Sequence, residues 1–145
     1  MKIVEGTKRE LENIVKLAIM LWPNSSEEEL NLHFTKLLDK EDAVIFLAEE
    51  EDQYIGFAHC QLRFDYVEGT DTSPAGYLEG IYVMEEYRKR GIGKELVTYC
   101  EEWSRQKGCT EFASDIELDN VDSFNFHLKV GFKEVNRLIC FAKKL

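Results

Sequence analysis

The chain has 145 residues, of which 44% are hydrophobic and 32% charged, and its 28 acidic and 18 basic side chains give a net charge of −10. This length fits one domain with a core of its own, and the composition argues against a disordered chain. The acidic balance opposes binding to a nucleic-acid backbone, which requires a basic surface. It suits a cationic small molecule, although the same charge can serve solubility alone.

No apolar run approaches the roughly 20 residues that span a membrane. The N-terminal stretch MKIVEGTKRE lacks the apolar core of a signal peptide, so we expect a cytoplasmic protein. The four cysteines form no CxxC pair, and no histidine stands at metal-ligand spacing from them. We therefore expect reduced, structural thiols and no metal site.

In chain order, the pattern first predicts a short strand at 2–5 and two amphipathic helices. Thr7 with Glu10 three residues later is typical of a helix start, and Trp22-Pro23 ends that helix. Ser25 or Ser26 opens the second helix. Residues 43–50 and 54–64 are β-rich and are separated by a polar turn, which predicts a hairpin.

The second half of the chain alternates strands and helices. Residues 65–76 have the composition of a loop, and 77–83 form a strand that Gly80 interrupts, a common place for a bulge or a close backbone approach. A helix at 91–106, a strand at 111–115, a helix at 121–130 and one or two closing strands at 132–145 follow. We predict a single α/β (or α+β) domain, 1–145, with a mixed central sheet of six to seven strands, about four flanking helices and a bulge near Gly80.

The segment YRKRGIGK (87–94) joins a predicted strand to a predicted helix. Free backbone N–H groups at a helix start bind anions, and Gly91 and Gly93 let a phosphate come close. Four basic side chains add positive charge there: Arg88, Lys89, Arg90 and Lys94. The pattern is neither GxxxxGK[ST] nor a dinucleotide GxGxxG. The alternative is a basic helix cap without a ligand.

This segment resembles the [QR]xxGx[GA] pyrophosphate loop of the GCN5-related N-acetyltransferases (GNAT), which bind acetyl-CoA. A downstream set resembles that family's second motif, NxxSxxx[YH]xxxGF: Asn120, Ser123, His127 and Gly131-Phe132. The order of elements agrees along the whole chain. Several stretches from 21 to 132 are similar to bacterial aminoglycoside 6′-N-acetyltransferases: LWP (21–23), DYV (65–67), Gly69, SP (73–74), LEGI (78–81), KGC (107–109) and ASD (113–115).

The resemblance implies a set of binding residues. The aminoglycoside would contact Trp22, Tyr66, Glu79 and Asp115, and acetyl-CoA would contact Ile81, Tyr82, Val83, Lys89, Arg90, Gly91, Ile92, Gly93, Lys94 and Asn120. The family pattern leads us to expect a further acidic substrate contact near position 136, where this chain has Asn136, with Glu134 close by. This departure concerns the substrate range and leaves the reaction unchanged.

The expected chemistry explains the acidic residues. A protonated amine cannot attack a thioester, so the site must bind the cation and accept its proton. Glu79, beside the bulge, is the better candidate for the base, and Asp115 ends the next strand. Backbone N–H groups near Ile81 to Val83 would stabilise the oxyanion. His127 is either a general acid for the leaving thiolate or a packing residue near the cofactor.

Two other functions fit the same motifs. The chain is alternatively a GNAT enzyme that acetylates a polyamine or a protein amine, or a non-catalytic module that binds acyl-CoA or the drug. We expect acetyl-CoA and a cationic aminoglycoside as partners, with no nucleic acid and no membrane. The family is commonly dimeric, and LICFAKKL (138–145) can complete or cross a sheet, so we expect a homodimer.

Overall fold

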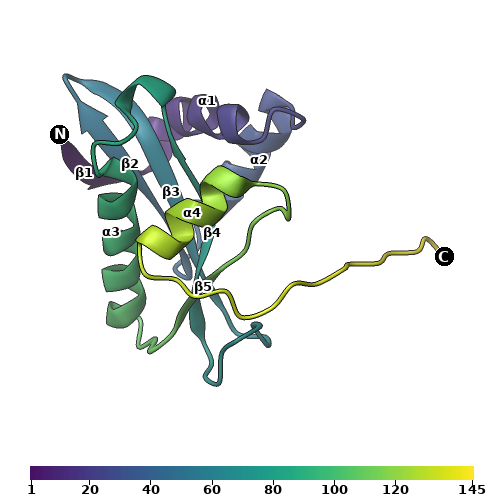
Figure 1. Ribbon diagram of the computed structural model, residues 1–145. Coiled ribbons are helices and arrows are strands. Elements are labelled where there is room, and N and C mark those ends of the chain that lie inside the picture. The colour runs from purple at the N-terminus through teal and green to yellow at the C-terminus, as the bar shows by residue number, and fades with distance from the viewer.

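The computed structural model describes residues 1–145 and has one mixed sheet with four α-helices (Figure 1). The strands are β1 (Lys2–Glu5), β2 (Ala43–Glu50), β3 (Gln53–Arg63), β4 (Ala75–Val83) and β5 (Phe112–Ser114). The α-helices are α1 (Leu11–Leu21), α2 (Glu27–Leu37), α3 (Ile92–Gln106) and α4 (Val121–Lys129), and two short 3₁₀ helices are η1 (Lys8–Glu10) and η2 (Glu85–Tyr87).

The strands lie in the order β1-β2-β3-β4-β5. The first four are antiparallel neighbours, whereas β4 and β5 are parallel and pair only from Gly76 to Leu78. The predicted hairpin of β2 and β3 is confirmed, and its turn at Glu51 and Asp52 has positive φ angles. Because β5 is so short, the second half of β4 has a strand partner on one side only.

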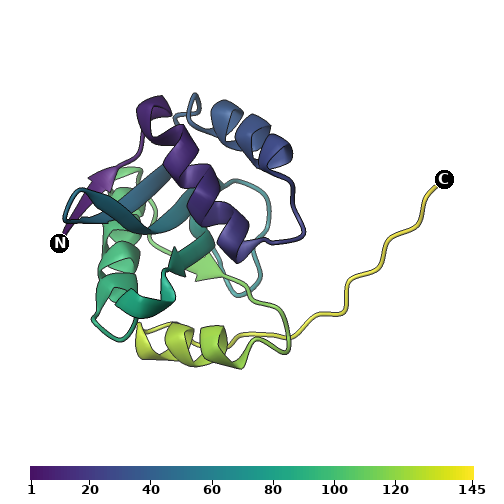
Figure 2. The ribbon, with the colours of Figure 1, turned by 90° about the horizontal axis from the view of Figure 1, so that it is seen from above.

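Helices cover both faces of the sheet (Figure 2). On one face, α1 and α2 pack through an apolar cluster that includes Ile14, Phe34 and Phe57. On the other face, Leu96 and Cys100 of α3 lie in a second cluster, and Phe126 of α4 packs against it. Helices α1, α2 and α3 therefore bury an apolar stripe, whereas α4 has no buried residue and contacts the core through partly buried side chains.

A β-bulge interrupts the pairing of β3 and β4 at the predicted place. Cys60 pairs with Leu78, and its neighbour His59 pairs with Gly80, so Glu79 is the extra residue and has no partner in the ladder. A bulge of this kind bends a strand and turns the extra side chain in a new direction. The bulge adjoins Gly80 as expected, and the residue that it presents is Glu79.

The prediction of six to seven strands is wrong, because the sheet has five. Residues 132–145 form no strand and leave the body as an extended tail (Figure 1). A strand needs a neighbour to bond its N–H and C=O groups, and residues 132–145 pair with no strand of their own chain. The remaining strands and helices agree with the predicted ranges within a few residues at each end. None of the helices is long and apolar enough to cross a membrane.

Candidate active site

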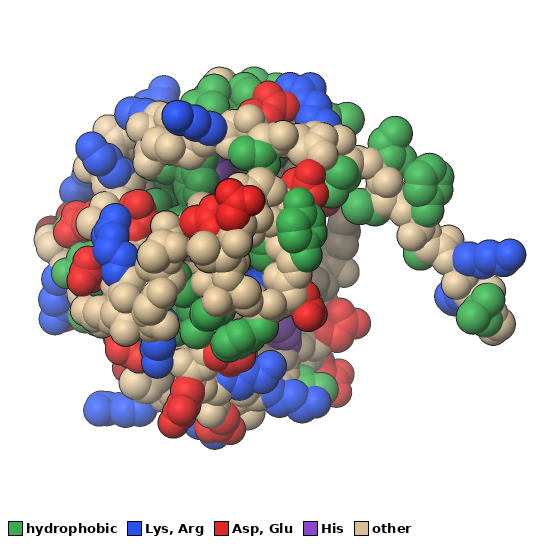
Figure 3. Space-filling model, turned by 90° about the horizontal axis from the view of Figure 1, so that it is seen from below, with side chains coloured by type: hydrophobic (Ala, Val, Ile, Leu, Met, Phe, Trp, Pro, Cys, Tyr) green, Lys and Arg blue, Asp and Glu red, His purple; other side chains and the backbone are tan.

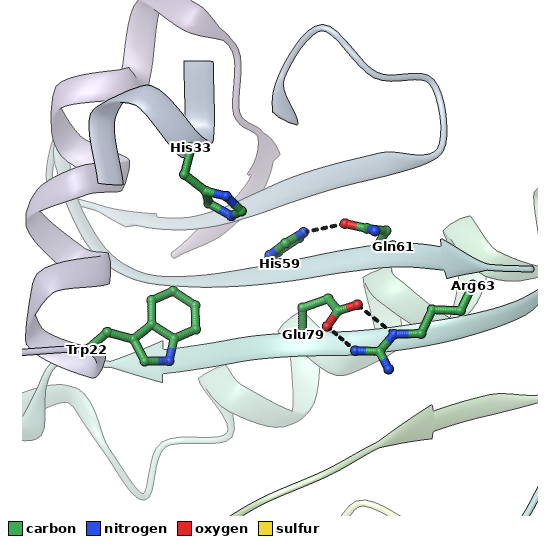
Figure 4. Close-up of a pocket in the computed structure, with 6 residues that line it drawn as sticks. All are labelled: Trp22, His33, His59, Gln61, Arg63 and Glu79. Carbon is green, nitrogen blue, oxygen red and sulfur yellow. Dashed lines mark hydrogen bonds and ion pairs between the residues drawn. The ribbon is translucent and has the colours of Figure 1, made fainter. Parts of the chain in front are cut away.

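A cavity of about 490 Å³ opens at the bulge (Figure 4). Its walls come from the end of α1, from α2 and from the two strands that form the bulge. Six residues line it: Trp22, His33, His59, Gln61, Arg63 and Glu79. Two of the predicted substrate residues, Trp22 and Glu79, therefore share one cavity.

Sequence reasoning missed the wall that β3 contributes. His59, Gln61 and Arg63 alternate with apolar residues, and successive side chains of a strand point to opposite faces of the sheet. All three consequently lie on the same face and line the cavity (Figure 4). The signal was present as three polar side chains at every second position of an otherwise apolar strand.

His59 is only 4% exposed, and Gln61 lies beside it with its Oε1 atom 3.3 Å from His59 Nε2. Burial lowers the pKa of His59 from 6.5 to about 4. The imidazole is therefore neutral near pH 7 and presents one donor and one acceptor. The exposed His33 faces it from α2, with 6.2 Å between the ring centroids.

Glu79 is the only carboxylate in the lining, and Arg63 holds it. The Arg63 Nη2 and Nε atoms donate to Glu79 Oε1 and Oε2 at 2.6 and 2.9 Å. Glu79 raises the pKa of Arg63 through these bonds. The only carboxylate that lines the cavity is therefore already paired with an arginine.

Asp115 lies outside the cavity lining but is linked to it. It follows β5, is exposed, and accepts a hydrogen bond from the Tyr77 hydroxyl. The Arg63 guanidinium carbon lies 3.4 Å from the centroid of the Tyr77 ring. Burial and Asp115 raise the pKa of Tyr77, so its hydroxyl stays a donor. The two predicted carboxylates, Glu79 and Asp115, are thus the ends of one chain of contacts.

Trp22 owes its place to Gly80. A Cβ atom at Gly80 would lie 2.7 Å from the Trp22 ring atoms Cη2 and Cζ2, so only glycine admits the ring there. The ring also meets Phe57 edge to face at 6.1 Å between centroids. Trp22 is therefore held against the bulge by packing from two strands.

Two further predicted substrate residues lie away from the cavity. Tyr66 is 79% exposed on the loop between β3 and β4. Asn136, on the tail, donates through Nδ2 to Glu68 Oε1 on the same loop at 2.6 Å. The structure thus brings Asn136 to the Tyr66 loop but brings neither residue into the cavity lining.

The predicted cofactor loop wraps the start of α3. Gly91 precedes the helix with a φ angle of +81°, and a Cβ there would meet nothing within 4 Å. Arg88 donates to the Val83 carbonyl, and Arg90 forms a two-pronged ion pair with Glu50. Because Arg90 is paired with a carboxylate, the unpaired positive charge near this helix start comes from three other residues, Arg88, Lys89 and Lys94.

Gly93 lies against the neighbouring helix α4. A Cβ at Gly93 would lie 2.9 Å from the Phe126 ring of α4, so this glycine makes room for a neighbouring helix. Ile92 is 3% exposed and anchors the first turn in the core. The open approach to the helix start is consequently at Gly91.

Asn120 and His127 are both engaged by α4 itself. The Asn120 side chain caps the helix by accepting from the Ser123 N–H. His127 Nδ1 lies 2.7 Å from the Ser123 carbonyl, which can only accept, so Nδ1 carries the proton. Nε2 lies 2.8 Å from the Ser114 hydroxyl, so both ring nitrogens are engaged. These contacts favour the packing alternative for His127.

The free side of β4 lies next to the bulge. Ile81, Tyr82 and Val83 pair with β3, but β5 ends its pairing at Leu78. Some backbone N–H groups of this segment therefore point away from β3 without a strand partner. Such donors can hold an amide chain or stabilise an oxyanion.

Comparisons with known proteins agree with this geometry. The family model "Acetyltransferase (GNAT) family" matches residues 11–132. The chain is 39% identical over 145 residues to an aminoglycoside N(6′)-acetyltransferase type 1 from Acinetobacter haemolyticus, covering 100% of this chain and 99% of the relative. The chain belongs to the GNAT acetyltransferase family. This confirms the resemblance carried by its two motifs.

Solved structures match over the same length. The apo crystal structure of aminoglycoside 6′-N-acetyltransferase AAC(6′)-Ig from A. haemolyticus has a TM-score of 0.96 and covers 100% of this chain and 99% of its own. AAC(6′)-Iy in complex with the bisubstrate analogue CoA-S-monomethyl-acetylneamine also has a TM-score of 0.96, at 35% identity, and covers 99% of this chain and 98% of its own. The GNAT member described here is thus similar, end to end, to aminoglycoside 6′-N-acetyltransferases.

Proposed function

We propose that this GNAT enzyme transfers the acetyl group of acetyl-CoA to the 6′-amino group of aminoglycoside antibiotics, by direct attack of the amine on the thioester, and so confers resistance. The end-to-end similarity to aminoglycoside N(6′)-acetyltransferases, at 39% identity, carries this proposal. The cavity supports it, because Glu79 and Trp22 offer a carboxylate and an aromatic face to an aminosugar. The whole chain, 1–145, acts as one acetyltransferase domain.

The residues at the start of α3 fit the pyrophosphate of acetyl-CoA. The first N–H groups of a helix have no partner within it, and the helix dipole favours an anion there. The open space at Gly91 leaves these groups accessible. The backbone from Lys89 to Lys94 would bind the pyrophosphate. Asn120, the first residue of the second motif, would bind the cofactor from the start of α4.

The bulged strand would hold the reacting end. Acetyl-CoA supplies the thioester, and the unpaired side of β4 from Ile81 to Val83 offers N–H donors to it. Removing one such donor in other enzymes costs on the order of 10²-fold in rate. No cysteine lines the cavity, which is consistent with direct transfer without an acyl-enzyme.

Two carboxylates are available for the proton of the amine. Glu79 lies in the cavity and is the better candidate, and Asp115 accepts from Tyr77 at the far end of the contact chain. Either acts directly or through a water molecule. His127 remains a candidate acid for the leaving thiolate, although both of its ring nitrogens are engaged.

Coenzyme A release, followed with a thiol reagent, tests the proposal. We expect rapid release with kanamycin or tobramycin, and none with an analogue that has a hydroxyl in place of the 6′-amine. Release with spermidine or a peptide amine instead would point to a general acetyltransferase. Binding of acetyl-CoA without turnover of any amine would point to a non-catalytic module.

The proposal includes a homodimer in the cytoplasm. The tail carries large apolar side chains that are exposed in the single chain, Ile139 at 83% and Phe141 at 91% (Figure 3). Exposed apolar segments mark contact surfaces, and an extended segment can pair with a sheet edge of a second copy. The proposal also includes substrate-binding roles for Tyr66 and Asn136. In the dimer, segments of the second copy would lie close to the loop that carries Tyr66.

A further inference from the structure

Arg63 is the one cavity residue whose charge opposes a cationic substrate. An arginine beside the only carboxylate of a site for polycations needs an explanation, because it cancels the charge that would attract the drug. Two explanations predict opposite effects. Arg63 either competes with the drug for Glu79 or holds Glu79 in the geometry that the reaction needs.

The contacts favour the second explanation. Each Glu79 oxygen accepts one bond from the planar guanidinium fork, at 2.6 and 2.9 Å. A carboxylate has about four lone-pair sites, so about two remain for an ammonium group. Arg63 therefore fixes the carboxylate plane without filling its capacity.

Glu79 has an unusual need for such support. It is the extra residue of the bulge and has no partner opposite it in the β3–β4 ladder. Its side chain is only 19% exposed and lies at the edge of the open cavity. Side-chain packing and inter-strand hydrogen bonds hold an ordinary strand residue in place. The Glu79 side chain is held instead by its ion pair with Arg63 (Figure 4).

Arg63 is itself held in place by Tyr77. Its guanidinium lies on the Tyr77 ring at 3.4 Å, and the Tyr77 hydroxyl is anchored on Asp115. Tyr77 is 6% exposed, so the base of this stack is rigid. The Arg63 guanidinium thus contacts both the Tyr77 ring and Glu79, and the Arg63 side chain is 40% exposed. A cation that is held by two partners is poorly suited to leave when a drug arrives.

We propose that Arg63 is a positioning residue, which holds Glu79 at the bulge so that the free lone pairs of its carboxylate face the acceptor amine. This inference rests on the proposed function of the cavity. It names a residue of β3 that acts through Glu79, and it assigns Tyr77 as the support of Arg63.

The test is steady-state kinetics of Arg63→Ala with kanamycin, with kcat/KM for the drug and KM for acetyl-CoA measured separately. Misplacing a reacting group by about 1 Å costs on the order of 10²-fold, so we expect kcat/KM for the drug to fall by about that factor. KM for acetyl-CoA stays unchanged. Competition predicts the opposite sign, a lower KM for the drug with kcat preserved.

A double-variant cycle separates positioning from damage to the fold. If Arg63 acts through Glu79, Arg63→Ala lowers kcat/KM in the native background and does not lower it further beside Glu79→Gln. Added guanidinium, at concentrations that do not denature, restores part of the activity of Arg63→Ala. Arg63→Lys keeps an aliphatic side chain and the positive charge but loses the planar guanidinium group that donates two parallel hydrogen bonds. We expect its activity to lie between that of the wild type and that of Arg63→Ala.

Arg105→Ala is the matched control. Arg105 also pairs with carboxylates, Glu101 and Glu102, but on the exposed end of α3, so its loss leaves both kinetic constants unchanged. A wild-type chain that acetylates no drug overturns the proposed function and this inference together. Normal turnover with a tighter drug KM in Arg63→Ala, or an equal loss in both backgrounds, overturns the inference alone.

Discussion

At the residue scale, Gly80 and Trp22 occupy complementary positions. A methyl group at Gly80 would lie 2.7 Å from the Trp22 ring, which lines the cavity, so the ring must move in Gly80→Ala. Overpacking of this kind costs about 1–3 kcal/mol. We expect this loss of stability in urea unfolding, together with a rise of roughly tenfold in KM for the drug, about 1.4 kcal/mol of binding.

A smaller ring is the control for this prediction. Trp22→Phe in the Gly80→Ala background removes the atoms that clash, so we expect the stability to recover while drug binding stays weak. A Gly80→Ala variant with the stability and KM of the wild type would show that the ring is not held where the structure has it.

Below neutral pH, the titration of His59 affects stability. Its pKa is about 4 in the folded chain and 6.5 ordinarily, so between these pH values the unfolded chain binds a proton that the folded chain does not. The free energy of unfolding therefore falls as pH decreases from 6.5 to 4, by about 3 kcal/mol at the lower end. Urea unfolding across this range measures the loss.

One variant isolates the contribution of this histidine. His59→Gln cannot take up a proton, so its stability should fall less steeply between pH 6.5 and 4. Equal slopes for the variant and the wild type would assign the pH dependence to other groups.

Sequence reasoning reached some of these residues and not others, for a physical reason. The family resemblance pointed to Glu79 and Trp22, and Gly80 beside Glu79 marked the bulge by a local signal. Arg63, His59 and Tyr77 lie inside regular strands, where polar residues are ordinarily placed toward solvent. Their contacts depend on the register across β3 and β4, which no local pattern specifies.

At the element scale, α3 and α4 meet at the start of α3. The Phe126 ring fills the space beside Gly93, and a Cβ atom on that residue would lie 2.9 Å from the ring. In Gly93→Ala, α4 must shift away from the proposed pyrophosphate site. We expect KM for acetyl-CoA to rise about tenfold, with KM for the drug unchanged. Phe126→Leu in the same background should restore most of the affinity, whereas a rise in the drug KM instead would contradict the assignment.

The elements themselves were predictable where their signals are local. Caps and apolar spacing predicted α1 to α4, and Thr7 and Glu10 do form a capping box before α1. The closing strands were not predictable in the same way. Residues 132–145 have a strand-like pattern, but a strand also needs a neighbour, and the single chain supplies none.

At the scale of the whole molecule, the proposed homodimer depends on the tail. Its exposed apolar side chains, including Leu138, Ile139 and Phe141, have no cover in one chain, and we expect a second copy to cover them. Light scattering should give twice the monomer mass for the full chain and the monomer mass after removal of 138–145. Serine at those three positions, with the backbone intact, should also give a monomer, because burial of the apolar side chains drives the association. A full chain that stays monomeric, or a shortened one that stays dimeric, would contradict this role of the tail.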